Sequence, residues 1–184
     1  MSRRLVLKQD MSLDGFVGKP DGDLDFIFTS FDDALVQWIV ADVWKAGLHI
    51  MGAKTYGDMA AHWPISTEPF APPMNEIPKA VFSNHLKDTH WGETEIIRGD
   101  LTEGIKRLKA QDGKDIYAHG GASFVRSLIV TGLIDEYHLV IHPVVIGRGL
   151  PIFSEIAKPF DLALVENRSF AKGTVVNIYR PIKE

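Results

Sequence analysis

The chain has 184 residues, of which 45% are hydrophobic and 24% are charged, and its formal net charge at pH 7 is −4. This length suits one substantial hydrophobic core, and the composition is typical of a folded domain rather than of a disordered chain. The cations are scattered along the sequence, so nucleic acid is not an expected partner. Because there is no cysteine, disulfides, thiolate metal sites and a cysteine nucleophile are excluded.

No segment has the roughly 20 consecutive apolar residues that a membrane-spanning helix needs. The basic start of the chain is followed by an apolar run that stops at Lys8, which is too short for a secretory signal. We therefore expect a cytoplasmic protein that has no membrane partner.

Strand-like and helix-like segments alternate from the start of the chain to residue 132. The predicted strands are residues 3–9, 48–52, 79–84, 94–99 and 114–119, and the predicted helices are residues 33–46, 54–62, 101–111 and 121–132. Residues 63–78 contain five of the ten prolines, so we expect a loop there.

The alternation stops after residue 132, and the segments 134–147, 160–171 and 173–181 are all strand-like. The dipeptide Lys172-Gly173 can close a hairpin between the last two. Alternating strands and helices predict a parallel sheet under crossover helices, to which a hairpin adds antiparallel strands. We therefore predict a single α/β domain over residues 1–184, with a mixed, mostly parallel sheet flanked by helices and a C-terminal antiparallel hairpin.

A glycine pair, Gly120 and Gly121, separates a predicted strand from a predicted helix in the stretch IYAHGGASFV. The first turn of a helix offers unpaired N–H groups and the positive end of the helix dipole, which suit a phosphate group. Glycine also lets a ligand approach the backbone. A tight strand-to-helix turn would need the same residues without any ligand, and the pair is not the three-glycine dinucleotide fingerprint. Both interpretations therefore stay open for the pair alone.

Two further strand ends favour the ligand interpretation. In IMGAKTYGDM, Lys54 and Thr55 stand where a helix begins after a glycine. Threonine is a good helix cap, but a lysine there opposes the helix dipole unless an anion binds nearby. The strand VFSNHL ends in Ser83, Asn84 and His85. Because ligands of open α/β sheets bind at the carboxyl ends of strands, the three ends together predict a site for an extended nucleotide.

These motifs, with LVLKQDMSLDGFVG and the long block of residues 116–153, resemble the dihydrofolate-reductase-like family. The more similar branch includes the reductase domain of the bifunctional riboflavin-biosynthesis deaminase-reductase, and the resemblance spans roughly residues 3–181. It implies a reductase that is commonly dimeric and that uses NADPH, with NADH as a possible alternative. The hydride would pass to a C=N or C=O bond of a small heterocyclic or sugar-derived substrate, such as a riboflavin-pathway pyrimidine.

The resemblance also implies the residues that contact the cofactor. The pyrophosphate would lie on the first strand-end junction, which is Gly120, Gly121, Ala122 and Ser123. The adenosine-side phosphates would lie on the second junction, Gly52, Ala53, Lys54 and Thr55, and the adenosine ribose on the third, Ser83, Asn84 and His85. Backbone groups of Asp10 and Val17, near the first strand, would hold the nicotinamide carboxamide. A strained or cis peptide between the two glycines is part of the same pattern.

The sequence departs from the family at the cofactor's 2′-phosphate. Ala53 and Asn84 stand where the family often has arginines that bind this phosphate, and Lys54 and His85 are the nearby substitutes. Because lysine lacks the bidentate fork of arginine, we expect only a modest preference for NADPH over NADH.

Lys8, Asp14 and His119 are the candidate catalytic residues. His119 stands where the riboflavin-type reductase has an acid, and it would either supply a proton or bond to a neighbouring carbonyl. Lys8 interrupts an apolar strand, so it would contact substrate from a central strand or lie in solvent on an edge strand. Asp14 belongs to the turn SLDG, which the resemblance places near the nicotinamide.

Two alternatives to this function remain. Dihydrofolate reductases carry an acid on the first long helix, but Asp32 and Asp33 lack its sequence context and suit a helix start instead. A nucleotide-binding sensor without turnover is the alternative outside enzymes. His138 and His142 would lie on one face of a strand about 13 Å apart, too far for one ion, so we expect no metal site.

Overall fold

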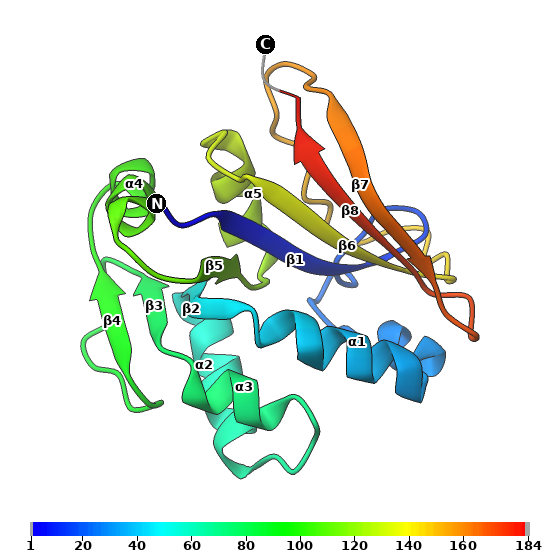
Figure 1. Cartoon of the computed structure of the whole chain (residues 1–184), viewed down its shortest axis with the longest axis horizontal. Helices are drawn as coiled ribbons and strands as arrows, with labels where there is room; N and C mark the ends of the chain where they lie inside the picture. Colours follow the sequence, from blue (N-terminus) through cyan, green and yellow to red (C-terminus); the bar gives the residue numbers. More distant parts are fainter. Residues whose placement is uncertain (1, 183–184) are drawn as a thin grey trace.

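The structure is a computed structural model that describes residues 2–182. One eight-stranded sheet runs through the molecule in the order β4-β3-β2-β5-β1-β6-β8-β7 (Figure 1). The strands are β1 (Leu5–Ser12), β2 (Ala46–Gly52), β3 (Lys79–Phe82), β4 (Thr94–Ile97), β5 (Asp115–Ala118), β6 (Glu136–His142), β7 (Leu162–Ser169) and β8 (Val175–Pro181). Neighbouring strands from β4 to β6 are parallel, and β8 pairs antiparallel with both β6 and β7. The predicted mixed sheet with a C-terminal hairpin is therefore confirmed.

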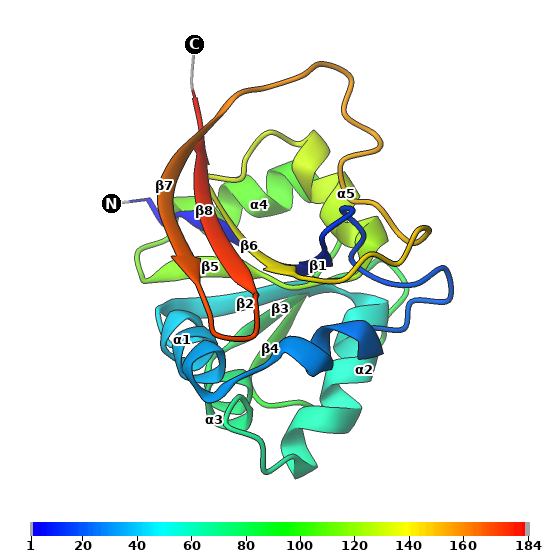
Figure 2. The same cartoon turned by 90° about the vertical axis from the view of Figure 1, so that its right-hand side faces the viewer.

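Helices cover both faces of the sheet (Figure 2). The helices are α1 (Asp33–Val43), α2 (Ala53–His62), α3 (Ala71–Glu76), α4 (Leu101–Ala110) and α5 (Ala122–Val130), with short 3₁₀ turns η1 (Asp25–Ser30) and η2 (Trp63–Ile65). One core cluster joins the sheet to α4 and α5, and a second joins its other face to α1, α2 and α3. The central parallel strands are apolar on both faces, as a sheet covered by helices requires.

Strand β1 lies in the middle of the sheet, between β5 and β6. Leu5 and Leu7 pack into the cluster beneath α4 and α5, while Val6 faces the opposite side. Lys8 follows on that opposite side, and its side chain is only 9% exposed. The alternative of a solvent-exposed Lys8 on an edge strand is therefore wrong.

Residues 63–78 do not form the continuous loop that their prolines predict. They contain η2 and the short helix α3. Pro72 and Pro73 fall in the first turn of α3, where a missing N–H costs no helical hydrogen bond. Burial of Ala71 and Met74 stabilises this turn against the core.

The C-terminal hairpin turns at the predicted Lys172-Gly173 pair. The N–H of Gly173 donates to the carbonyl of Phe170, and the N–H of Phe170 donates to the carbonyl of Thr174. Gly173 has φ +88°, a backbone conformation that glycine adopts without steric cost. Within residues 2–182, none of the helices has the length and apolar character needed to span a bilayer.

Candidate active site

A cleft of about 930 Å³ opens at the carboxyl ends of β3, β2, β5 and β1. Its volume lies near the upper end of the range for small-molecule sites, which is roughly 300–1,000 Å³. All the sequence-predicted cofactor residues except Asp10 line this cleft. They are Val17, Gly52, Ala53, Lys54, Thr55, Ser83, Asn84, His85, Gly120, Gly121, Ala122 and Ser123. The fold thus brings together three junctions that are far apart in the sequence.

Two of the helices that begin at the cleft, α2 and α5, lack a side-chain cap. Helix α2 starts after Gly52 and α5 starts after Gly121, and neither glycine can supply a capping side chain. The cap expected from Thr55 is therefore wrong, because Thr55 lies inside the first turn of α2. Two sets of unpaired N–H groups and two positive dipole ends face the same cleft, which suits a phosphate-containing ligand.

The two glycines of the pair differ in conformation and surroundings. Gly121 has φ +55°, and a Cβ atom there would lie 2.7 Å from Oγ1 of Thr55. Gly120 is open, since the nearest atom to a Cβ built on it is Oε1 of Gln9 at 4.0 Å. No peptide bond within residues 2–182 is cis. The unusual backbone expected here is therefore a positive φ at Gly121 instead of a cis bond.

The third junction is held by side-chain to backbone hydrogen bonds. Oδ1 of Asn84 accepts from the N–H of Gly99 at 2.8 Å. The guanidinium of Arg98 donates to the carbonyls of Ser83, Asn84 and Leu86. Arg98, which no sequence pattern indicated, brings a cation to the strand end where the resemblance implies an arginine.

Lys54 is oriented differently from its expected role. Its Nζ atom lies 3.7 Å from the Cβ position of Gly22, in the segment that follows β1. Strand β1 and strand β3 lie on opposite sides of β2 in the sheet. Lys54 therefore extends away from the β3 junction at 83–85, and it is poorly placed to substitute for an arginine there.

Two other lining residues, Gln9 and Arg126, were not anticipated. Within residues 2–182, only two buried side-chain nitrogen or oxygen atoms lack a hydrogen-bond partner, and they are Oε1 of Gln9 and Nε of Arg126. Both residues line the cleft. The Arg126 Nε atom lies 3.4 Å from a carboxylate oxygen of Glu155, an ion pair without a hydrogen bond. Arg126 could have been found from its position one helical turn after Ala122.

A polar network lies on the α1 face of β1, beside the cleft. Nζ of Lys8 donates to Oδ2 of Asp10 at 2.9 Å, and Nε2 of His142 donates to Oδ1 at 3.0 Å. Nδ1 of His142 shares a 2.7 Å hydrogen bond with the hydroxyl of Ser30. Burial raises the pKa of Asp10, but the charge of Lys8 and the hydrogen bond from His142 outweigh it and hold that pKa well below its ordinary value. The Asp10 side chain is thus an anion at the centre of the network, and neither Lys8 nor Asp10 lines the cleft.

His119 is turned away from the cleft. Its Nε2 atom lies 2.8 Å from Nδ1 of His49, whose Nε2 lies 3.2 Å from the carbonyl oxygen of Pro73. Burial lowers the pKa of His49 to about 4, and burial followed by repulsion from His49 and Lys8 lowers the pKa of His119 far below its ordinary value. Both rings are neutral at pH 7. Because a carbonyl only accepts, His49 donates to Pro73 and His119 donates to His49. The Nε2 proton of His119 is therefore donated to His49, and a catalytic role for His119 stays a prediction.

Two candidate carboxylates have structural partners. Asp14 is exposed and accepts hydrogen bonds from the backbone N–H groups of Ile146 and Gly147. It therefore links the turn after β1 to the loop after β6. Asp32 caps α1 by accepting from the N–H of Leu35 at 2.8 Å. Asp14 does not line the cleft, and Asp32 is bound as the helix-start interpretation predicts.

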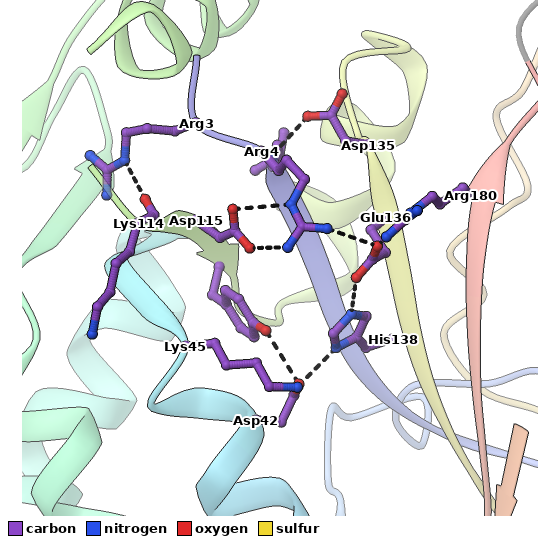
Figure 3. Close-up of polar contacts among 12 residues, drawn as sticks. Arg3, Arg4, Asp42, Lys45, Lys114, Asp115, Asp135, Glu136, His138 and Arg180 are labelled. Carbon is purple, nitrogen blue, oxygen red and sulfur yellow. Dashed lines mark hydrogen bonds and ion pairs between the residues drawn. The ribbon is translucent and has the colours of Figure 1, made fainter. Parts of the chain in front are cut away.

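A second buried network surrounds His138 at the opposite end of β6 (Figure 3). Its Nδ1 lies 2.8 Å from Asp42 and its Nε2 lies 2.7 Å from Glu136. Burial lowers the pKa of His138, but hydrogen bonds to the two carboxylates outweigh it and raise that pKa above its ordinary value. Glu136 also binds Arg4 and Arg180. Within residues 2–182 no group of three or more potential ligands could hold a metal ion.

Comparison with known proteins supports this fold. A family model described as the RibD C-terminal domain matches residues 3–176. The uncharacterized protein YyaP of Bacillus subtilis (strain 168) is 29% identical over 182 residues, covering 96% of this chain and 94% of that protein.

Solved structures share the same architecture. A putative riboflavin biosynthesis protein from Shewanella sp. PV-4 has a TM-score of 0.81 at 21% identity, with both chains fully covered. A diaminohydroxyphosphoribosylaminopyrimidine deaminase/5-amino-6-(5-phosphoribosylamino)uracil reductase from Thermotoga maritima has a TM-score of 0.71 at 18% identity, covering 98% of this chain and 57% of that one. A dihydrofolate reductase from Enterococcus faecalis, complexed with NADP(H), has a TM-score of 0.64 at 14% identity, with both chains fully covered. The predicted dihydrofolate-reductase-like fold is therefore confirmed.

Proposed function

Because the chain belongs to the RibD C-terminal domain family, we propose that it is a reductase that takes hydride from NADPH or NADH. The substrate would be a small heterocyclic or sugar-derived molecule with a C=N or C=O bond, of the kind that a riboflavin-pathway pyrimidine represents. The bound dinucleotide would supply the hydride, while the protein binds and orients both partners and excludes water.

One observation carries this proposal, which is the meeting of three strand-end junctions in a single cleft. The uncapped first turns of α2 and α5 would bind the two phosphates of the dinucleotide through backbone N–H groups. Lys54 and Arg126 add positive charge to the same cleft, and Asp58 is the one lining carboxylate among the residues described. An extended, doubly anionic ligand therefore suits this arrangement better than a neutral one.

The network beside the cleft would serve the substrate. Lys8 is held by Asp10 on a central strand, next to the end of β5 where the glycine pair begins. Since the Nε2 proton of His119 is donated to His49, we assign proton supply to Lys8. Hydride adds to the carbon of the C=N or C=O bond, and a proton adds to the nitrogen or oxygen. A lysine cation also suits an anionic or carbonyl-rich substrate.

Steady-state oxidation of NADPH, with dihydrofolate or with the riboflavin-pathway pyrimidine as substrate, tests this function. We expect turnover of the pyrimidine class and little or none of dihydrofolate, because Asp32 is used as a helix cap. Lys8→Met should abolish turnover and leave NADPH binding intact, whereas Lys106→Met, an exposed site, should change neither. Efficient turnover of dihydrofolate would support the alternative that the protein is a dihydrofolate reductase. NADPH binding without turnover of either substrate would support the alternative of a nucleotide-binding sensor.

We also propose a homodimer. Strand β7 is an unpaired edge of the sheet, and its Leu164 and Val165 are 57% and 47% exposed. Edge strands with apolar side chains favour pairing with a second chain. Light scattering across a tenfold concentration range should give the dimer mass, and a constant monomer mass would contradict the proposal.

A further inference from the structure

We infer that Gln9 recognises the carboxamide of the bound dinucleotide, with its side-chain oxygen accepting a hydrogen bond from the carboxamide nitrogen. The inference rests on the proposed function, and it assigns a residue of this chain that selects the nicotinamide end of the ligand.

Gln9 is a polar residue in an apolar row. It lies on β1 between Leu7 and Met11, which face the same side of the sheet and belong to the core beneath α5. Gln9 itself is only 7% exposed. A buried amide in such a row is unfavourable unless both its oxygen and its nitrogen find partners. A purely structural residue at this position would be expected to be apolar.

Only the nitrogen of Gln9 has a partner in the protein. Nε2 donates to the carbonyl oxygen of Asp10 at 3.2 Å, while Oε1 is buried and has no hydrogen bond. Gln9 lines the cleft, and Oε1 lies 4.0 Å from the Cβ position of Gly120, where the backbone is open. A carbonyl oxygen can only accept, so an N–H or O–H group of a ligand bound in the cleft would be a suitable partner for Oε1.

The position of Gln9 selects which donor this is. The uncapped helices follow β2 and β5, so the phosphates would lie there and the two nucleoside ends would extend toward β3 and β1. In the proposed function Lys8 on β1 supplies the proton, so the hydride would be transferred at the β1 end of the cleft. The nicotinamide therefore lies at the β1 end, and its carboxamide nitrogen is the donor that a side-chain amide oxygen matches.

The backbone groups expected to hold the carboxamide are partly engaged already. The carbonyl of Asp10 accepts from Gln9, and the N–H of Val17 donates to the carbonyl of Leu150 at 3.0 Å. Gln9 is thus hydrogen-bonded to the backbone group that the resemblance assigned to the carboxamide, and it offers its own oxygen to the cleft. We therefore assign recognition of the nicotinamide carboxamide to the side-chain amide of Gln9 instead of to these backbone groups.

The test compares two ligands against two variants. The ligands are NADPH and its 3-acetylpyridine analogue, in which a methyl group replaces the carboxamide NH₂ group. The variants are Gln9→Leu and the control Gln37→Leu, an exposed glutamine on α1. We expect Gln9→Leu to weaken NADPH binding about tenfold, as the loss of one hydrogen bond implies, and to change analogue binding less than about twofold. Gln37→Leu should change neither affinity.

The stability of the unliganded protein gives a second readout. Replacing a buried amide whose oxygen has no partner with an apolar side chain should leave the melting temperature unchanged or raise it. If Gln9→Leu does not fold, Gln9→Met, which keeps an unbranched side chain of similar length, takes its place in the same comparison.

The outcomes separate the inference from the function. Equal losses of both ligands, or no loss of either, would overturn the role of Gln9 while leaving the dinucleotide cleft intact. A lower melting temperature without selective loss of NADPH would show a structural glutamine. If the unmodified protein binds neither ligand, the proposed function fails and the inference fails with it.

Discussion

Thr55 and Gly121 approach each other so closely that a Cβ atom on Gly121 would lie 2.7 Å from the hydroxyl oxygen of Thr55. The first turn of α2 and the start of α5 therefore meet at this point, with no room for a side chain between them. Gly121 serves the backbone geometry of this contact, whereas the open face of Gly120 is the one that a ligand can approach.

Gly121→Ala should destabilise the protein whether or not a ligand is bound. A positive φ at a residue with a side chain costs roughly 1–3 kcal/mol, and the contact with Thr55 adds to this cost. Chemical denaturation without cofactor measures the loss. The double variant Thr55→Ala/Gly121→Ala should regain only the stability lost to the contact with the Thr55 hydroxyl, and not the part lost to the positive φ. An unchanged free energy of unfolding in Gly121→Ala would contradict the positive φ and close contact at this residue.

Lys54→Met should weaken NADPH and NADH binding by similar factors, because Nζ lies near Gly22 and not near the third junction. Arg98→Met should reduce the ratio of the two affinities, since Arg98 holds the 83–86 segment. Calorimetric titration of both dinucleotides checks this. We expect the overall NADPH preference to stay below roughly a thousandfold, about 4 kcal/mol. A larger preference that Lys54→Met removes would mean that Lys54 binds the 2′-phosphate.

Arg126→Gln should weaken dinucleotide binding about tenfold and reduce its dependence on salt, as expected for the loss of one phosphate contact. Glu155→Gln should leave affinity unchanged or raise it, because it releases Arg126 from its ion pair. Arg107→Gln, an exposed control on α4, should have no effect. Unchanged affinity in Arg126→Gln would contradict a contact between Arg126 and a phosphate of the dinucleotide.

Sequence patterns predicted most of the fold because the hydrophobic periodicity and the glycine stops act locally. They also identified the strand ends that form the cleft, since parallel strands carry their carboxyl ends to one edge. Orientation was harder to predict. His119 adjoins the glycine pair in sequence, but its ring bonds to His49, which is 70 residues away. Lys54 stands at a helix start, but its flexible side chain extends toward Gly22. Such directions depend on tertiary packing.

The missed residues show the same limit. Gln9 and Arg126 lie within quoted motifs but were not assigned a role, and only the three-dimensional structure shows that each lines the cleft and has a buried atom without a hydrogen bond. Pro72 and Pro73 predicted a loop because proline usually ends a helix, but burial of their neighbours allowed them to begin one.

His138→Gln should reduce stability by about 3 kcal/mol near pH 6, because it leaves Asp42 and Glu136 without their shared partner. The folded-state pKa of His138 is raised above 6.5. Its contribution is therefore complete below pH 6.5 and is lost as the pH rises through the folded-state pKa. Denaturation between pH 6 and 9 should show a fall in stability that His138→Gln flattens and that His85→Gln, an exposed control, retains. A fall of equal size in His138→Gln would contradict this assignment.

Calorimetric titration of NADPH into the unmodified protein and into Gly120→Val tests the central claim most directly. A valine at Gly120 would project into open space in the cleft, so the fold should persist while the ligand is blocked. Gly57→Val is the matched control, because the Cβ position of Gly57 on α2 is open as well and Gly57 does not line the cleft. We predict that the unmodified protein and Gly57→Val bind NADPH, and that Gly120→Val binds it at least about a hundredfold more weakly, a loss of roughly 2.7 kcal/mol. Equal NADPH binding by a folded Gly120→Val would contradict the claim that the glycine pair receives the dinucleotide.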